Sequence, residues 1–94
     1  MNSPAALHVI VKGHVQGVYF RAFAEKHAVS LGLTGYVRNL PTGDVELLAE
    51  GEREDLAELV EQLRLGPPYS RVTEVIVEWQ EPAGKFKKFQ INYF

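Results

Sequence analysis

The residues best suited to chemistry lie in one short stretch, residues 13–21, with the sequence GHVQGVYFR. The stretch contains two glycines and no acidic residue, and it ends in an arginine. Gly13 and Gly17 permit positive φ angles, so successive backbone N–H groups can converge on one anion at the start of a helix. The guanidinium of Arg21 can hold two phosphoryl oxygens through paired hydrogen bonds. These features indicate a site for a single phosphoryl group.

The position of Arg21 in the following helix strengthens this interpretation. A cation in the first helical turn opposes the helix dipole by about 0.3–1 kcal/mol, and a bound anion would reverse that sign. The alternative is a plain glycine-containing turn, in which Arg21 pairs with Glu25 or extends into solvent. Short glycine motifs match many unrelated sequences, so the loop by itself leaves both interpretations open.

Asn39 is the second candidate, because it ends a strand-like run just before the turn LPTGD. Val37 and Asn39 point to one face of that strand, while Tyr36 and Arg38 point to the other. Only one of Arg38 and Asn39 can therefore face a given site. Asparagine is also a favoured turn residue, and spacing alone does not separate that role from a catalytic one. We expect this strand to lie beside the first strand of the chain.

The hydrophobic pattern predicts the elements that must position these residues. Strands show alternation of apolar and polar residues, helices show apolar residues three and four apart, and glycine and proline mark the breaks. A turn at PTGD joins the second and third strands, and a turn at QEPAGK joins the last two. The predicted strands cover residues 7–12, 34–40, 45–51, 72–79 and 86–94, and the predicted helices cover residues 20–31 and 52–65.

This order of elements, βαββαβ followed by an extra strand, predicts an α+β fold. We expect a ferredoxin-like sandwich with an antiparallel sheet, both helices on one face and the extra C-terminal strand at an edge. Residues 1–94 are expected to form a single domain. The same architecture serves RNA binders, metallochaperones, regulatory sensors and enzymes, so function has to come from the site.

Composition narrows the classes of partner and cofactor. A net charge of −2 at pH 7 argues against a nucleic-acid-binding protein, since such binding depends largely on neutralising phosphates. The absence of cysteine excludes disulfides, thiolate catalysis and cysteine-containing metal sites, and no apolar run is long enough to span a membrane. His8, His14 and His27 have no spacing that would assemble a metal site. We expect no metal and no other cofactor, a cytoplasmic location and a monomer.

Other polar and aromatic residues have structural explanations. The acids at 52, 54 and 55 match the dipole at a helix start, which argues against a catalytic role. Trp79 and the aromatic residues of the C-terminal tail are expected to pack in the core and at the sheet edge. An RNA-binding module would need exposed aromatics on the central strands, and GYVRNL lacks that pattern. A regulatory module that binds a small anion without catalysis remains the alternative.

Taken together, GHVQGVYFR, GYVRN and GDVE resemble the acylphosphatase family. The similarity extends over essentially the whole chain, including the closing strand around Phe89, Ile91 and Tyr93. Two motifs in the right order are far more specific than either one. The matching positions are Gly13, Val15, Gln16, Gly17, Val18, Phe20 and Arg21, and then Gly35, Tyr36, Val37, Asn39, Gly43 and Val45.

The resemblance implies metal-independent hydrolysis of acyl phosphates to a carboxylate and inorganic phosphate. It implies that Arg21 binds the phosphoryl group and that Asn39 positions the attacking water. The phosphate-binding loop is expected to act mainly through its backbone, Gln16 included, and comprises Val15, Gln16, Gly17, Val18, Tyr19 and Phe20. Acylphosphatase-like domains also occur inside larger carbamoyl-transferring proteins, but a chain of 94 residues has no room for their other domains, so we expect it to act alone.

Overall fold

The computed structural model describes residues 3–93 and has the predicted order of elements. Phe94, which the predicted last strand included, lies outside the described residues. The strands and helices follow one another as β1 (Pro4–His14), α1 (Phe20–Ser30), β2 (Thr34–Asn39), β3 (Val45–Glu52), α2 (Arg53–Leu65), β4 (Arg71–Gln80) and β5 (Phe89–Asn92).

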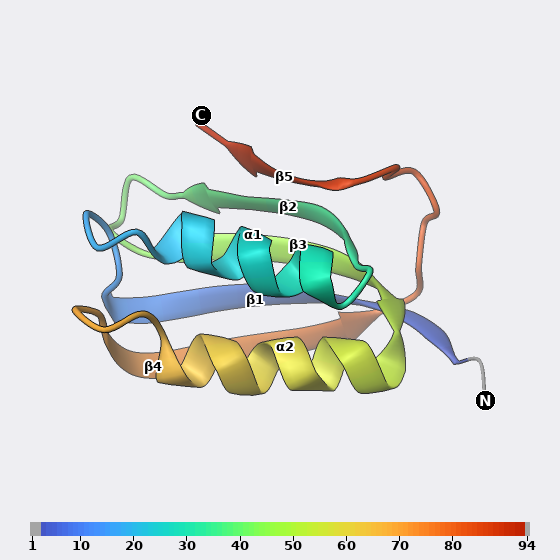
Figure 1. The fold of residues 1–94 in the computed structure, drawn as a ribbon, viewed down its shortest axis with the longest axis horizontal. Coiled ribbons are helices and arrows are strands. Elements are labelled where there is room, and N and C mark those ends of the chain that lie inside the picture. The colour runs from blue at the N-terminus through green and yellow to red at the C-terminus, as the bar shows by residue number, and fades with distance from the viewer. Residues whose placement is uncertain (1–2, 94) are drawn as a thin grey trace.

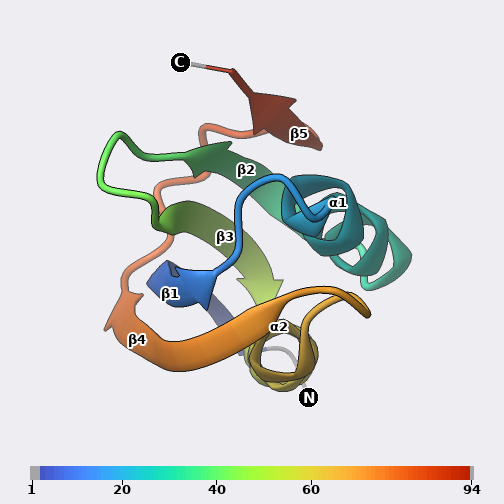
Figure 2. The ribbon, with the colours of Figure 1, turned by 90° about the vertical axis from the view of Figure 1, so that its left-hand side faces the viewer.

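The strands form one sheet in the order β4-β1-β3-β2-β5, and both helices cover the same face of it (Figures 1 and 2). The pairs β1–β3, β1–β4 and β2–β3 are antiparallel. β5 adds to the edge of β2 in the parallel direction, so the complete sheet is mixed. The predicted ferredoxin-like sandwich with an extra C-terminal edge strand is confirmed.

One expected strand neighbour is wrong, because β2 does not lie beside β1. β3 lies between them and pairs with both. A helix is about 10 Å wide, whereas neighbouring strands are about 4.8 Å apart, so a crossover through α1 passes over one strand position. The tight turn after β2 then brings β3 back into that position.

The predicted turn at QEPAGK does not join neighbouring strands either. Residues 81–88 run across the end of the sheet, because β4 and β5 are its opposite edges (Figure 1). The carboxylate of Glu50 accepts hydrogen bonds from the backbone N–H groups of Ala83 at 2.8 Å and Gly84 at 3.0 Å. The N–H of Gly35 donates to the carbonyl of Lys88 at 3.0 Å. These contacts lead the chain across the sheet to the edge of β2.

The hydrophobic core fills the space between the sheet and the helices. Alternate residues of the strands point into it, as the period of two predicts. From the helices the buried residues are Phe20, Ala24 and Ala28, and Leu56, Leu59, Val60 and Leu63; from β1, β2 and β3 they include Leu7, Val9, Val11, Val37, Val45, Leu47 and Ala49.

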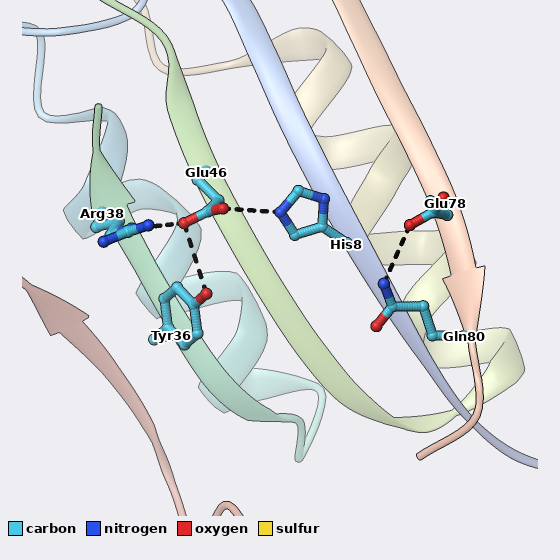
Figure 3. A network of polar contacts seen from close by, with 6 residues as sticks. All are labelled: His8, Tyr36, Arg38, Glu46, Glu78 and Gln80. Carbon is cyan, nitrogen blue, oxygen red and sulfur yellow. Dashed lines mark hydrogen bonds and ion pairs between the residues drawn. The ribbon is translucent and has the colours of Figure 1, made fainter. Parts of the chain in front are cut away.

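The open face of the sheet carries a network of polar side chains centred on Glu46. Figure 3 shows its carboxylate between the ring of His8 and the side chains of Arg38 and Tyr36. The distance from His8 Nε2 to Glu46 Oε2 is 2.8 Å. Burial raises the pKa of the Glu46 carboxyl, but the hydrogen bonds from His8 and Arg38 outweigh it and leave the pKa below its ordinary value. The network therefore joins β1, β3 and β2 through an ionised carboxylate.

The strand directions bring three chain segments to one edge of the molecule. β1 and β2 are both antiparallel to β3 and are therefore parallel to each other, and β5 is parallel to β2. The C-terminal ends of β1, β2 and β5 consequently lie at the same edge, on the left in Figure 1 and toward the viewer in Figure 2. That edge holds the loop after β1, Asn39 and Tyr93.

Candidate active site

A pocket of about 390 Å³ opens at this edge. It brings the loop, Arg21 and Asn39 together, although Arg21 and Asn39 are far apart in the sequence. Two predicted loop residues do not line it, because Val18 is buried in the core and the side chain of Gln16 bonds elsewhere. The lining residues are Val15, Gly17, Tyr19, Phe20, Arg21, Ala22, Asn39, Ile91 and Tyr93.

The loop presents its backbone to the pocket because its apolar side chains are anchored beneath it. Val15, Val18 and Phe20 are all buried. Within the described chain, the backbone N–H groups of residues 15–20 donate no hydrogen bond to another residue. Successive N–H groups that have no acceptor in the chain and lead into the start of a helix can converge on a bound anion.

Two residues of the loop have left-handed backbone conformations. Gly17 has a φ of 75°, and Tyr19, at the N-cap of α1, has a φ of 64° and a ψ of 26°. A residue with a Cβ atom loses about 1–2 kcal/mol in this region, which glycine avoids. The strain at Tyr19 is of the kind found at ligand sites, where the surroundings force an unusual backbone.

Gly13 lies at an irregularity in the pairing of β1 with β4, just before β1 ends at His14 and the loop begins. Its φ is 126°, and the register between β1 and β4 shifts at Lys12 and Gly13. A Cβ atom at this position would lie 2.0 Å from the carbonyl oxygen of Arg71. Only glycine therefore fits this close approach between the two backbones.

Arg21 is the second residue of α1, and the first turn of this helix contains no acid. The ion pairs formed among residues 3–93 do not include Arg21, so the alternative pairing with Glu25 is not found. Its guanidinium carbon lies 4.7 Å from the centre of the Tyr93 ring. Stacking on an aromatic ring occupies the face of the guanidinium and leaves its N–H edge able to bind an anion.

Asn39 contributes its side-chain amide to the wall of the pocket. Its Oδ1 atom is buried and finds no hydrogen-bond donor among the described residues. An unsatisfied buried acceptor costs about 1–3 kcal/mol, so its place in a pocket suggests a bond to a ligand or a water. As the strand alternation predicts, Arg38 lies on the opposite face and bonds to Glu46.

The turn after Asn39 is tied to β1 by one side chain and to the loop after β1 by another. Lys12 and Asp44 form an ion pair of 2.9 Å, and the hydrogen bond from Lys12 lowers the pKa of the Asp44 carboxyl. Gln16 donates through Nε2 to the backbone carbonyls of Leu40 and Asp44. The side chain of Gln16 thus contacts the turn and leaves the pocket to the loop backbone.

Sequence reasoning missed Ala22, Ile91 and Tyr93 as pocket residues. The expectation that the tail aromatics pack in the core or at the sheet edge is wrong for Tyr93, which is 75% exposed and lies over Arg21. Its role depends on the parallel pairing of β5, and no local pattern in the sequence reports that direction.

The remaining polar candidates lie away from the pocket. Glu54 and Asp55 occupy the first turn of α2, as the helix dipole favours, and the ring of His27 packs 4.5 Å from that of Phe23. Among residues 3–93, no three histidine or acidic side chains gather in a way that could hold a metal ion. The helices of the described chain are too short or too polar to cross a membrane.

A family model, a related sequence and a solved structure all match this chain to acylphosphatases. The acylphosphatase family model matches residues 7–91. An acylphosphatase of Dehalococcoides mccartyi is 49% identical over 88 residues, which cover 93% of this chain and 97% of the relative. The crystal structure of acylphosphatase from Bacillus subtilis superimposes with a TM-score of 0.92 at 38% identity and covers 95% of this chain and 99% of that one.

The fold also matches part of a much larger protein. The crystal structure of full-length HypF in the phosphate- and nucleotide-bound form superimposes with a TM-score of 0.88 at 29% identity. That match covers 99% of this chain but 12% of the HypF chain. With a family model that spans residues 7–91 and relatives matched over nearly their whole length, the chain belongs to the acylphosphatase family.

Proposed function

We propose that this protein hydrolyses the carboxyl–phosphate anhydride of acyl phosphates to a carboxylate and inorganic phosphate. The observation that carries the proposal is the run of N–H groups at residues 15–20 that find no acceptor among residues 3–93 and border the same pocket as Arg21 and Asn39. Membership of a family of enzymes favours catalysis over the alternative of a non-catalytic anion-binding module.

In this proposal the loop backbone and Arg21 hold the phosphoryl group. Phosphoryl transfer passes through a loose transition state, so catalysis depends mainly on positioning and on stabilising charge. Donors that are already in place provide this stabilisation without rearrangement as the charge moves. The stacking of Arg21 on Tyr93 supports such a fixed arrangement.

Asn39 would position the water through its amide oxygen. The water oxygen bonds to phosphorus, the bond between phosphorus and the acyl oxygen breaks, and its electron pair leaves with the carboxylate. The pocket lining of the described chain contains no aspartate, glutamate or histidine. We therefore infer that the water proton passes to a phosphoryl oxygen of the substrate. A carboxylate-like pKa in the rate profile that disappeared on mutation of one acid would contradict this step.

The remaining lining suits an apolar or aromatic acyl group. Tyr19 and Tyr93 are 85% and 75% exposed, and Ala22 and Ile91 complete this side of the pocket. The expected monomeric state stays a prediction. The expected cytoplasmic location and the absence of a nucleic-acid partner stay predictions.

The proposal is tested by measuring benzoyl phosphate hydrolysis in the presence of a chelator, with inorganic phosphate as a competitive inhibitor. We expect the wild type to hydrolyse benzoyl phosphate. In Arg21→Ala, kcat should fall roughly 100- to 1000-fold, because the guanidinium that donates hydrogen bonds to the transition state is removed. Arg64→Ala, which removes an exposed arginine in the last turn of α2 that does not line the pocket, is the control and should match the wild type. A folded wild type without turnover would contradict the proposal and favour the anion-binding module.

A further inference from the structure

One side chain of the phosphate-binding loop makes contacts that the proposed chemistry does not use. Gln16 lies between Val15 and Gly17, which line the pocket, yet its own side chain reaches the turn between β2 and β3. Its Nε2 atom donates to the backbone carbonyl oxygens of Leu40 and Asp44, each at 2.9 Å. A side-chain amide has two N–H donors, so Gln16 commits both of them to this turn.

The two carbonyls mark the ends of a turn that is itself closed by hydrogen bonds. The N–H of Leu40 donates to the carbonyl of Asp44 at 2.9 Å, and the N–H of Gly43 donates to the carbonyl of Leu40 at 3.1 Å. Leu40 directly follows Asn39, whose side chain lines the pocket and carries a buried amide oxygen without a hydrogen-bond donor among the described residues. Gln16 therefore holds the backbone one residue away from Asn39.

We propose that Gln16 is a positioning residue whose side-chain amide sets the separation between the loop of residues 15–20 and Asn39. This inference rests on the proposed function, in which the loop holds the phosphoryl group and Asn39 holds the water. The distance from the water oxygen to phosphorus then depends on how the loop and the turn sit against each other. In such sites a displacement of about 1 Å can lower the rate roughly 100-fold.

The ion pair between Lys12 and Asp44 reaches the same turn but fixes it less firmly. The side chain of Lys12 is 40% exposed, and exposed ion pairs are screened by solvent and salt. The hydrogen bonds of Gln16 are partly buried, join a side chain to backbone atoms, and attach to the loop itself. The Gln16 amide is therefore the more direct link between the loop of residues 15–20 and the turn that follows Asn39.

The test compares Gln16→Met with the wild type in benzoyl phosphate hydrolysis and in inhibition by inorganic phosphate. Methionine keeps the length of the side chain and removes both donors, while the backbone N–H at position 16 remains. We expect kcat to fall roughly 10- to 100-fold and the phosphate inhibition constant to stay near the wild-type value. The control is Gln62→Met on α2, which removes an Nε2 bond to Glu58 of the same length, 2.9 Å, and should leave kcat unchanged.

A double-mutant cycle separates positioning from a structural role. In the Asn39→Ala background, Gln16→Met should lower kcat little further, because the group that it positions is already absent. Gln16→Asn, whose amide is one methylene short of the turn, provides the same comparison if Gln16→Met fails to fold. An unchanged kcat, an equal fold-loss in both backgrounds, or a loss of phosphate affinity that matches the loss of kcat would overturn the proposal. A wild type without turnover would instead contradict the proposed function and, with it, this inference.

Discussion

Arg21 and Asn39 contribute different chemical groups to the pocket and are held there differently. Arg21 offers a cation on a helix without acids in its first turn, and its guanidinium rests on an aromatic ring. Asn39 offers a buried oxygen that the described residues leave without a donor. We therefore assign phosphate binding to Arg21, because a cation attracts the phosphoryl group. We assign water positioning to Asn39, because its amide is neutral.

This division predicts a difference between two alanine substitutions. Asn39→Ala should lower kcat by roughly 100-fold or more while phosphate inhibition remains, because it removes only the contact to the water. Arg21→Ala should lower kcat and also weaken inhibition by phosphate, since the guanidinium binds phosphate in the ground state as well as in the transition state. The comparison requires kcat and the inhibition constant of inorganic phosphate for each variant. Equal losses of phosphate affinity in the two variants would contradict the division.

The open face of the sheet shows how the elements keep the end of β2 in place. Glu46 on β3 bonds to His8 on β1 and to Arg38 and Tyr36 on β2. Arg38 immediately precedes Asn39, so the network fixes the strand register on one face while the pocket uses the other. Because these bonds lower the pKa of Glu46 in the folded state, the network should stabilise the fold in a pH-dependent way.

At the scale of the sheet we predict that Glu46→Gln lowers the free energy of unfolding by about 1 kcal/mol at neutral pH. The folded-state pKa of Glu46 lies below its ordinary value of 4.5, so its contribution is complete above that value and is lost as the pH falls through the lowered one. The difference between wild type and variant should therefore be smaller at a pH well below 4.5 than at neutral pH. Urea unfolding midpoints of the wild type and the variant, taken at both pH values, measure this difference in stability.

The control for this prediction is Glu78→Gln on β4. Figure 3 shows Glu78 on the same face, where its carboxylate accepts a hydrogen bond from the exposed Gln80 at 3.1 Å. Because solvent screens such an exposed contact, this variant should change stability little at either pH. A pH dependence of equal size in both variants would mean that the Glu46 network has no special effect.

At the scale of the whole molecule, a single core has to support the site. A domain of this length buries only roughly 60–65% of its unfolded surface, so each core side chain matters to stability. The two helices supply side chains to the same core, although only α1 lines the pocket. Stability and catalysis should therefore be separable by substitutions on α2.

Leu59→Ala on α2 tests this separation. Leu59 is completely buried, and its truncation should lower the free energy of unfolding by about 2–5 kcal/mol through lost burial and a cavity. Leu65→Ala is a matched control on the same helix, because Leu65 is 74% exposed and should cost less than about 0.5 kcal/mol. Denaturant unfolding gives both values. The kcat per folded Leu59→Ala molecule should equal that of the wild type, and a large loss would show that the core and the pocket are coupled.

The sequence by itself determined the elements, their buried faces and most of the pocket. Alternation and helical spacing report which side chains are buried, and the buried residues Val37, Leu56 and Leu59 lie where those patterns place them. The glycines, the arginine and the asparagine were identifiable because their conformational and chemical properties belong to the residues themselves. The family resemblance then directed attention to the two segments that the fold brings together.

The tertiary structure decided which strands are neighbours and what reaches the pocket from a distance. Periodicity shows that a strand is half-buried but not what it pairs with, so β3 between β1 and β2 was not foreseen. Tyr93 reaches Arg21 because Glu50 binds the crossing segment and β5 then pairs parallel to β2. Gln16 likewise finds its carbonyl partners 24 and 28 residues away in the chain. Such contacts depend on the path of the chain in space, which no local pattern of residues encodes.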